Sequence, residues 1–283
     1  MASSTQPFAV AARGVTLSGW LALPSAPSRG LVIALHGHGM TAGYFTGPAG
    51  PDQSLLDVGA ALGYTVWAPD RPGYGASEGI DHELAGMFPQ AELLLDAIRS
   101  FRGLHEMGAG CVIVGHSFGL KLALTMASMD HDVPLLGIDG SGSGLRYTFE
   151  PGVTAPEPIA GDLNPSWGPR HLYPASTFVR GVLPVAPRAF IPPNEAAEWP
   201  GEFRAFAAKV RIPVRFSFGD HERLWEISDG HFADLRALLT GCPRVEFAVQ
   251  EGAGHNVSLS HAARAYHLKA LAFADECLLR GAL

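Results

Sequence analysis

Runs of apolar residues alternate along most of this chain with stretches in which apolar positions recur at helical spacing. Continuous apolar runs rich in β-branched residues are typical of strands covered on both faces, and the second pattern is typical of amphipathic helices. Strands are predicted at residues 30–37, 64–70, 111–114, 133–139, 212–219 and 244–250, and helices near 52–62, 90–101, 232–239 and 260–279. The alternation predicts an α/β protein with a mostly parallel central sheet and helices on both faces.

The first segment of the chain follows a different pattern. Apolar and polar residues alternate on both sides of Arg13 and Gly14, in FAVAARG and VTLSGWLALP. Such alternation is typical of a strand with one face in solvent. The two segments therefore predict an antiparallel hairpin at an edge of the sheet.

The regular pattern stops between residues 145 and 205. This interval is rich in proline and in aromatic residues, namely Tyr147, Phe149, Trp167, Tyr173, Phe178, Phe190 and Trp199. Long loops without a regular pattern are uncommon unless they are functional. We therefore predict a core of residues 1–144 and 206–283 with an inserted cap or lid at 145–205. The alternative is a surface excursion that packs on its own aromatic side chains.

Composition and charge exclude several classes of protein. The 283 residues, of which 47% are hydrophobic, suit one large core and are too few for two full-sized α/β domains. A net charge of -7 without a cluster of Lys or Arg argues against nucleic-acid binding. No apolar run is long enough to span a membrane, and the start of the chain lacks the pattern of a signal peptide.

We therefore expect a soluble, cytoplasmic protein whose partner is a small molecule, and the sequence does not predict its oligomeric state. The three cysteines, Cys111, Cys242 and Cys277, follow no pattern and predict reduced thiols instead of disulfides.

Two G-x-S-x-G patterns occur, and their surroundings separate them. Ser77 lies among Pro and Gly residues in RPGYGASEG, which is typical of a loop. Ser117 follows the apolar run CVIV and precedes the helical pattern LKLALTMA. So short a turn from strand to helix strains its middle residue, and Gly115 and Gly119 lack side chains that would collide. Ser117 is therefore the predicted nucleophile, and the alternative is a tight turn with a capping serine.

A serine nucleophile requires a base, and the base requires an acid that orients it. His255 lies in the short loop EGAGHN after a predicted strand, at the edge of the sheet where Ser117 is expected. For the acid, the loop GDHE offers Asp220 and Glu222, and Asp139 ends an earlier predicted strand. The residues alone do not show which of these three carboxylates is the acid that orients His255.

Other polar groups near the predicted turn have simpler interpretations. The amide of Phe118 lies at a helix N-terminus, where it can stabilise an anionic oxygen. His116 is expected to shape the turn and not to act as the base. His36 and His38 form an H-x-H pair without a third ligand, so no metal site is predicted.

Taken together, these motifs resemble those of the α/β-hydrolase superfamily of serine hydrolases. The resemblance covers most of the chain and rests on LHGHGM, GYTVWAPDRPGYGASEG, GHSFG, GDHE and GAGHN, in the order nucleophile, acid and histidine. It implies the α/β-hydrolase fold, with the insertion as its variable cap domain. It also implies structural roles for Asp70 and Ser77 near the pocket.

The resemblance also implies specific roles at the site. The backbone amides of His38 and Phe118 would form the oxyanion hole. Glu222, three residues after Gly219, occupies the position of the family's acid. Aspartate is commoner there than glutamate, so Asp220 stays open as the alternative.

The predicted function is a serine esterase or thioesterase that acts on a small hydrophobic substrate through an acyl-enzyme, without cofactor or metal. The aromatic insertion is the reason to expect a hydrophobic substrate. A serine at position 117 disfavours the dehalogenation and epoxide opening that an aspartate would indicate. Hydrolysis of carbon–carbon bonds, peptidase or lyase chemistry, and a non-catalytic ligand-binding role stay as alternatives. The physiological substrate is not predicted.

Overall fold

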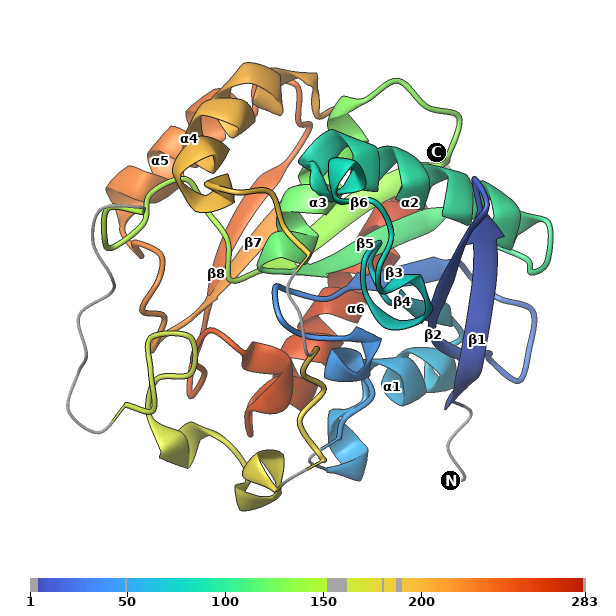
Figure 1. Cartoon of the computed structure of the whole chain (residues 1–283), viewed down its shortest axis with the longest axis horizontal. Helices are drawn as coiled ribbons and strands as arrows, with labels where there is room; N and C mark the ends of the chain where they lie inside the picture. The colour runs from blue at the N-terminus through green and yellow to red at the C-terminus, as the bar shows by residue number, and fades with distance from the viewer. Residues whose placement is uncertain (1–4, 49, 152–161, 180, 187–189, 282–283) are drawn as a thin grey trace.

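The computed structural model of the protein describes residues 5–48, 50–151, 162–179, 181–186 and 190–281. Its strands form a sheet in the order β1-β2-β4-β3-β5-β6-β7-β8 (Figure 1). They are β1 (Thr5–Ala12), β2 (Val15–Ala22), β3 (Leu31–Leu35), β4 (Thr65–Pro69), β5 (Cys111–His116), β6 (Leu135–Ser141), β7 (Val214–Gly219) and β8 (Val245–Gln250). The strands from β4 to β8 pair in parallel.

The predicted hairpin is confirmed at one edge of this sheet. β1 and β2 pair in antiparallel register and turn at Arg13 and Gly14, which both have positive φ, at 49° and 76°. β2 then pairs antiparallel with β4 and so joins the hairpin to the parallel strands.

Helices cover both faces of the sheet, as predicted (Figure 1). They are α1 (Leu55–Ala61), α2 (Met87–Arg102), α3 (Phe118–Ser128), α4 (Glu195–Phe206), α5 (Asp229–Leu238) and α6 (Ala263–Gly281). Ile33 and Leu35 of β3 pack in one apolar cluster with α2 and α3, whereas Val32 and Ala34 pack in a second cluster with α1 and α6. Because successive side chains of a strand point to opposite faces, one apolar run contributes side chains to the cores on both sides of the sheet.

Helix α4 corrects the expectation that residues 145–205 lack regular structure. It contains Pro200 followed by Gly201, and both residues usually interrupt helices. Trp199, Phe203 and Phe206 nevertheless recur at helical spacing and are buried in the core. Tertiary packing of this face therefore outweighs the low helix propensity.

The described remainder of the interval contains two short 3-10 turns, η5 (Arg170–Leu172) and η6 (Ala175–Phe178). The rings of Trp167, Tyr173 and Phe178 pack on one another with centroids 5.1–5.8 Å apart. The boundaries of the cap at 145 and 205 stay a prediction, and residues 152–161 of it lie outside the described residues. In the described ranges, no helix has the length and apolar character needed to cross a membrane.

A buried ion pair joins α3 to α4. Nζ of Lys121 lies 2.6 Å from Oε1 of Glu195 and donates to the hydroxyl of Tyr147 at 2.9 Å. The ring centroids of Trp199 and Trp225 lie 5.1 and 5.2 Å from the same nitrogen. Burial lowers the pKa of Lys121, and the charge of Glu195 opposes that effect.

Replacing Lys121 with methionine is expected to lower the free energy of unfolding by about 3–5 kcal/mol, because the carboxylate of Glu195 would stay buried without its partner. Urea denaturation followed by circular dichroism measures this difference. The double variant Lys121→Met/Glu195→Gln removes both charges and should be closer to the wild type. A single variant as stable as the wild type would contradict the expectation.

Candidate active site

Ser117 is the only residue between the end of β5 and the start of α3. Its backbone has φ 51° and ψ −115°, in a region that residues with a side chain rarely occupy. A Cβ at Gly115 would lie 2.7 Å from Cα of Leu120, and a Cβ at Gly119 would collide with the carbonyl oxygen of Leu35. The sharp turn therefore requires glycine on both sides of a strained serine.

His255 and Glu222 meet across two loops that follow neighbouring strands. Nδ1 of His255 lies 2.8 Å from Oε2 of Glu222, and both side chains are buried. The other oxygen, Oε1, accepts hydrogen bonds from the amides of Arg223 and Leu224 at 3.0 and 2.9 Å. Because an ionised carboxylate only accepts hydrogen bonds, Nδ1 of His255 carries the proton and Nε2 is left as the basic nitrogen.

Asp220, the alternative acid, forms its hydrogen bonds with backbone amides and not with the imidazole of His255. Its two carboxylate oxygens accept hydrogen bonds from the amides of Gly252 and Ala253 at 3.1 and 3.0 Å. These residues precede His255 in the loop after β8. Asp220 therefore anchors the loop that carries His255, and Glu222 contacts the imidazole.

Asp139, the third carboxylate, is engaged elsewhere. It is fully buried, forms an ion pair with Arg215 on the neighbouring strand β7, and accepts a hydrogen bond from the hydroxyl of Tyr266 at 3.0 Å. Burial raises its pKa, and the charge of Arg215 opposes the shift. Asp139 thus links the strands β6 and β7.

The end of β6 brings Ser117 and His255 to the same edge of the sheet. The amide of Ser117 donates to the carbonyl oxygen of Ser141 at 2.7 Å. A Cβ at the next residue, Gly142, would lie 2.9 Å from Nδ1 of His255 and 3.1 Å from the ring of His116. Sequence reasoning missed this segment, and the glycine-rich run DGSGSG after the predicted strand is the one signal that could have indicated it.

His116 is held as a neutral ring beside the catalytic candidates. It stacks on Tyr44 with centroids 4.5 Å apart, and its Nδ1 lies 3.1 Å from the hydroxyl of Ser141. The ring of His255 lies 4.9 Å away between centroids. Burial lowers the pKa of His116 well below its usual value, so the ring stays uncharged at neutral pH. It supports His255 and is not placed as the base.

The loop after β3 carries the other predicted oxyanion donor. A Cβ at Gly37 would lie 3.1 Å from Cβ of Ser117, so the loop passes directly beside the serine. His38, the next residue, is exposed. Phe118 is the first residue of α3, and the first amides of a helix have no partner within it. The backbone around Ser117 therefore offers donors from two different segments.

The two histidines of the H-x-H pair have different surroundings. His36 is fully buried, and its two ring nitrogens contact the carbonyl oxygen of Gly37 and the amide of Arg71. His38 is exposed in the loop instead. Across the ranges that are described, no three His, Cys, Asp or Glu side chains gather to hold a metal ion.

Asp70 and Ser77 have the structural roles that the resemblance implies. Asp70 accepts hydrogen bonds from the amide of Ala42 at 2.8 Å and from the hydroxyl of Ser18 at 2.7 Å. Ser77 closes its own loop by accepting from the amide of Gly73 at 3.0 Å.

Described residues of the interval 145–205 bond to the loop after β8 and to the loop after β3. Nδ2 of Asn256 donates to the carbonyl oxygen of Ser166 at 2.8 Å. On the other side, Met40 and Val185 form an isolated antiparallel bridge. The amide of Thr41 donates to Pro184 at 2.7 Å, and the amide of Ala186 donates to Gly39 at 2.9 Å.

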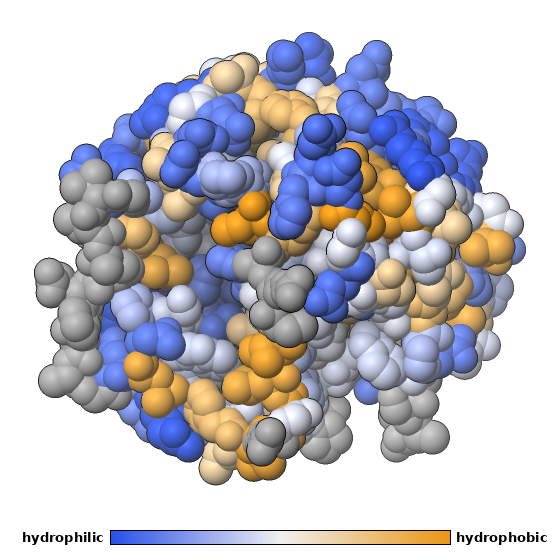
Figure 2. All heavy atoms as spheres, viewed as in Figure 1, coloured by the Kyte–Doolittle hydropathy of each residue, from blue (hydrophilic) through white to orange (hydrophobic). Residues whose placement is uncertain are grey.

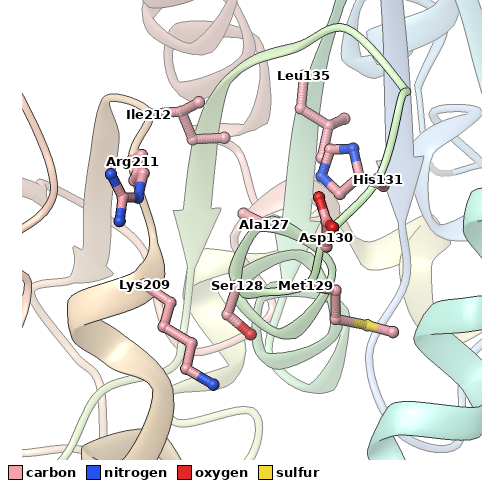
Figure 3. Close-up of a pocket in the computed structure, with 9 residues that line it drawn as sticks. All are labelled: Ala127, Ser128, Met129, Asp130, His131, Leu135, Lys209, Arg211 and Ile212. Carbon is pink, nitrogen blue, oxygen red and sulfur yellow. The ribbon is translucent and has the colours of Figure 1, made fainter.

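The surface view shows a hollow on this face of the molecule (Figure 2). Hydrophobic residues lie around parts of its rim, and the visible part of its floor is mainly hydrophilic (Figure 2). A separate groove of about 510 Å³ lies at the end of α3 and the start of β6 (Figure 3). Because α3 begins beside Ser117 and leads away from it, this groove is at the opposite edge of the sheet and contains none of the candidate catalytic residues.

Comparisons with known proteins agree with the fold. The model of a family described as "Alpha/beta hydrolase family" matches residues 32–267. No curated protein sequence matches the chain. Among solved structures, a thermostable carboxyl esterase from Bacillus coagulans has a TM-score of 0.71 at 16% identity, covering 97% of this chain and 99% of the other.

Two further structures are similar over nearly their whole length. A putative aryl esterase from Burkholderia cenocepacia has a TM-score of 0.69 at 17% identity, covering 96% of this chain and 99% of the other. A mutant N-acyl homoserine lactonase complexed with N-hexanoyl homoserine has a TM-score of 0.66 at 15% identity, covering 96% and 97%. At such low identity these likenesses establish the fold alone.

Proposed function

The chain belongs to the alpha/beta hydrolase family, and from this membership we propose that it is a serine hydrolase that cleaves an ester or thioester of a small hydrophobic substrate. One observation carries the proposal: the Nδ1–H of His255 donates to the buried carboxylate of Glu222, at the edge of the sheet where the strained Ser117 lies. That arrangement leaves an imidazole nitrogen free to accept a proton.

The proposed reaction has two steps. In the first, Nε2 of His255 accepts the proton of Ser117 while Oγ attacks the carbonyl carbon, and the amides of His38 and Phe118 hold the oxyanion. When the bond to the leaving group breaks, His255 donates this proton to the departing alcohol or thiol. In the second step, His255 accepts a proton from water as the water attacks the acyl-enzyme. It then returns that proton to Ser117 as the acid leaves.

The surroundings of the site support a hydrophobic substrate. In the described part of the insertion, the large apolar side chains of Leu163, Val179 and Val185 are exposed. Hydrophobic residues at the rim of the hollow would contact the acyl or alcohol group, and the hydrophilic floor suits the reacting carbonyl (Figure 2). The solved structures that resemble this chain include two named as esterases and one named as a lactonase, and a lactone is a cyclic ester.

A fluorophosphonate probe is expected to label Ser117, and mass spectrometry of the labelled peptide identifies the residue. Labelling should be lost in His255→Ala, because the serine then lacks its base. In assays with p-nitrophenyl esters and thioesters from acetyl to dodecanoyl, kcat/KM should be highest for the short uncharged acyl groups. Turnover of charged peptides alone would overturn the esterase proposal, and an unlabelled wild type would favour a non-catalytic role.

A further inference from the structure

Arg71, in the loop after β4, carries a buried charge whose hydrogen-bond acceptors are neutral. The side chain is fully buried. Its guanidinium donates to the carbonyl oxygen of His36 at 2.9 Å, to Oε1 of Gln90 at 3.0 Å and to the carbonyl oxygen of Gly37 at 3.3 Å. Burying a charge without an ionic partner is costly. A feature of this kind calls for a functional reason.

Aromatic faces complete the surroundings of this charge. The guanidinium carbon lies 4.6 Å from the ring centroid of Tyr74 and 4.4 Å from that of Phe118. Phe118 also supplies one of the two proposed oxyanion donors. The same side chain therefore packs against one donor residue and bonds to the segment that precedes the other.

The bond to Gly37 acts on the second donor through a shared peptide unit. The carbonyl group of Gly37 and the N–H of His38 belong to one planar trans peptide, so they point in opposite directions. The oxygen of this peptide unit is held toward Arg71, so its N–H points away from Arg71. Gly37, which belongs to the same unit, lies against Ser117. A donor on the oxygen also polarises the unit and strengthens its N–H as a donor.

His36 adds a second donor to the same oxygen. Its Nε2 accepts a hydrogen bond from the amide of Arg71 at 3.0 Å, so the proton of the neutral ring is on Nδ1. Nδ1 lies 2.9 Å from the carbonyl oxygen of Gly37 and donates to it. Burial lowers the pKa of His36 well below its usual value, followed by the charge of Arg71, and this keeps the ring neutral.

We propose that Arg71 is a positioning residue for the oxyanion site, which holds the Gly37–His38 peptide unit in its orientation and places a positive charge behind it. This role rests on the proposed function, because it needs an oxyanion to form beside Ser117.

Gln90→Glu is the sharpest test. It keeps the shape and the hydrogen bond at Nη1 but pairs Arg71 with a carboxylate, which cancels much of the positive field. It also removes the hydrogen bond that Nε2 of Gln90 donates to the carbonyl oxygen of Ala85 at 2.6 Å. We expect kcat to fall about three- to tenfold with KM nearly unchanged. Tm should also fall, because the carbonyl oxygen of Ala85 loses its donor, and the inhibitors below separate this loss of stability from the loss of kcat. Arg71→Met, which also removes the bond to Gly37, should lower kcat about 10–100-fold. Arg71→Lys keeps the charge without the fork and should lie between wild type and Arg71→Met.

Inhibitors separate positioning from stability. A trifluoromethyl ketone forms a hemiketal with the serine and so needs the oxyanion site, whereas the matching methyl ketone binds without this step. The inhibition constant of the first should rise in parallel with the loss of kcat in all three variants, and that of the second should not change. Leu93→Ala, in the core on the same helix as Gln90, is the control: it should lower Tm while keeping both kcat and the ratio of the two constants.

The outcomes are distinct. If the variants change only Tm and keep the wild-type ratio of inhibition constants, the role of Arg71 is wrong while the hydrolase proposal stands. If the wild type is not labelled by the fluorophosphonate and turns over no ester or thioester, both proposals are overturned together. If Arg71→Met does not fold, Gln90→Glu decides alone, since a kcat equal to the wild type would refute the contribution of the charge.

Discussion

Replacing Ser117 with alanine is expected to lower kcat by about 10⁴–10⁶-fold, because the acyl-enzyme can no longer form. KM should change little, since a missing hydroxyl leaves the hollow and the oxyanion donors in place. Alanine has the same backbone restriction as serine, so Tm should stay close to that of the wild type. Steady-state assays with the best ester of the panel, together with thermal unfolding, provide both measurements.

Ser117→Gly is the informative companion variant. It is equally inactive in our expectation, but it relieves the strain of a residue held at φ 51°, which typically costs about 1–3 kcal/mol. It should therefore be more stable than Ser117→Ala. An alanine variant that keeps a tenth of the wild-type kcat would show that another group is the nucleophile.

Replacing Glu222 with glutamine is expected to lower kcat by about 10³–10⁴-fold through the tautomer of His255. Two backbone amides already donate to Oε1 of Glu222, so the oxygen of a glutamine amide would stay there and its NH₂ group would face Nδ1. Nδ1 would then have to accept, which moves the proton to Nε2. The base would be blocked while the fold stayed intact.

Asp220→Asn is the matched control for this experiment. It removes one negative charge two residues away and weakens the anchoring of the loop before His255, but it leaves the imidazole bonded to Glu222. We expect only a severalfold decrease in kcat. Measuring kcat, KM and Tm for both variants decides the matter, and the reverse order of effects would make Asp220 the acid.

The sheet and the position of the candidate nucleophile are predictable because local signals for them agree. Strands such as β3 and β5 are buried on both faces, so their sequences are continuous apolar runs. Ser117 follows from its flanks, since the strand before it and the helix after it leave room for one turn alone. His255 follows from its place after the last predicted strand.

Which carboxylate contacts His255 is not predictable from local signals. Asp220 and Glu222 lie two residues apart in one loop, and the path of the backbone decides which side chain turns toward the imidazole. The helix α4 is missed for a related reason, because Pro200 and Gly201 are local breakers, whereas the packing of Trp199 and Phe203 is tertiary.

Arg71 lacks any local signal. An arginine in a loop is usually solvated. Its burial depends on His36 and Gln90, which lie 35 and 19 positions away in the chain. Only the folded arrangement reveals that these neutral oxygens replace water around the guanidinium.

The bridge between Met40 and Val185 has a consequence for protein engineering. It ties the segment around Val185 to the loop that bears His38, so the two segments are not interchangeable modules. A chimaera that received the insertion of another hydrolase would lose the bonds that Pro184 and Ala186 make to Thr41 and Gly39. Such a transplant would slow the reaction of every substrate alike, unless the donor segment recreated this short pairing.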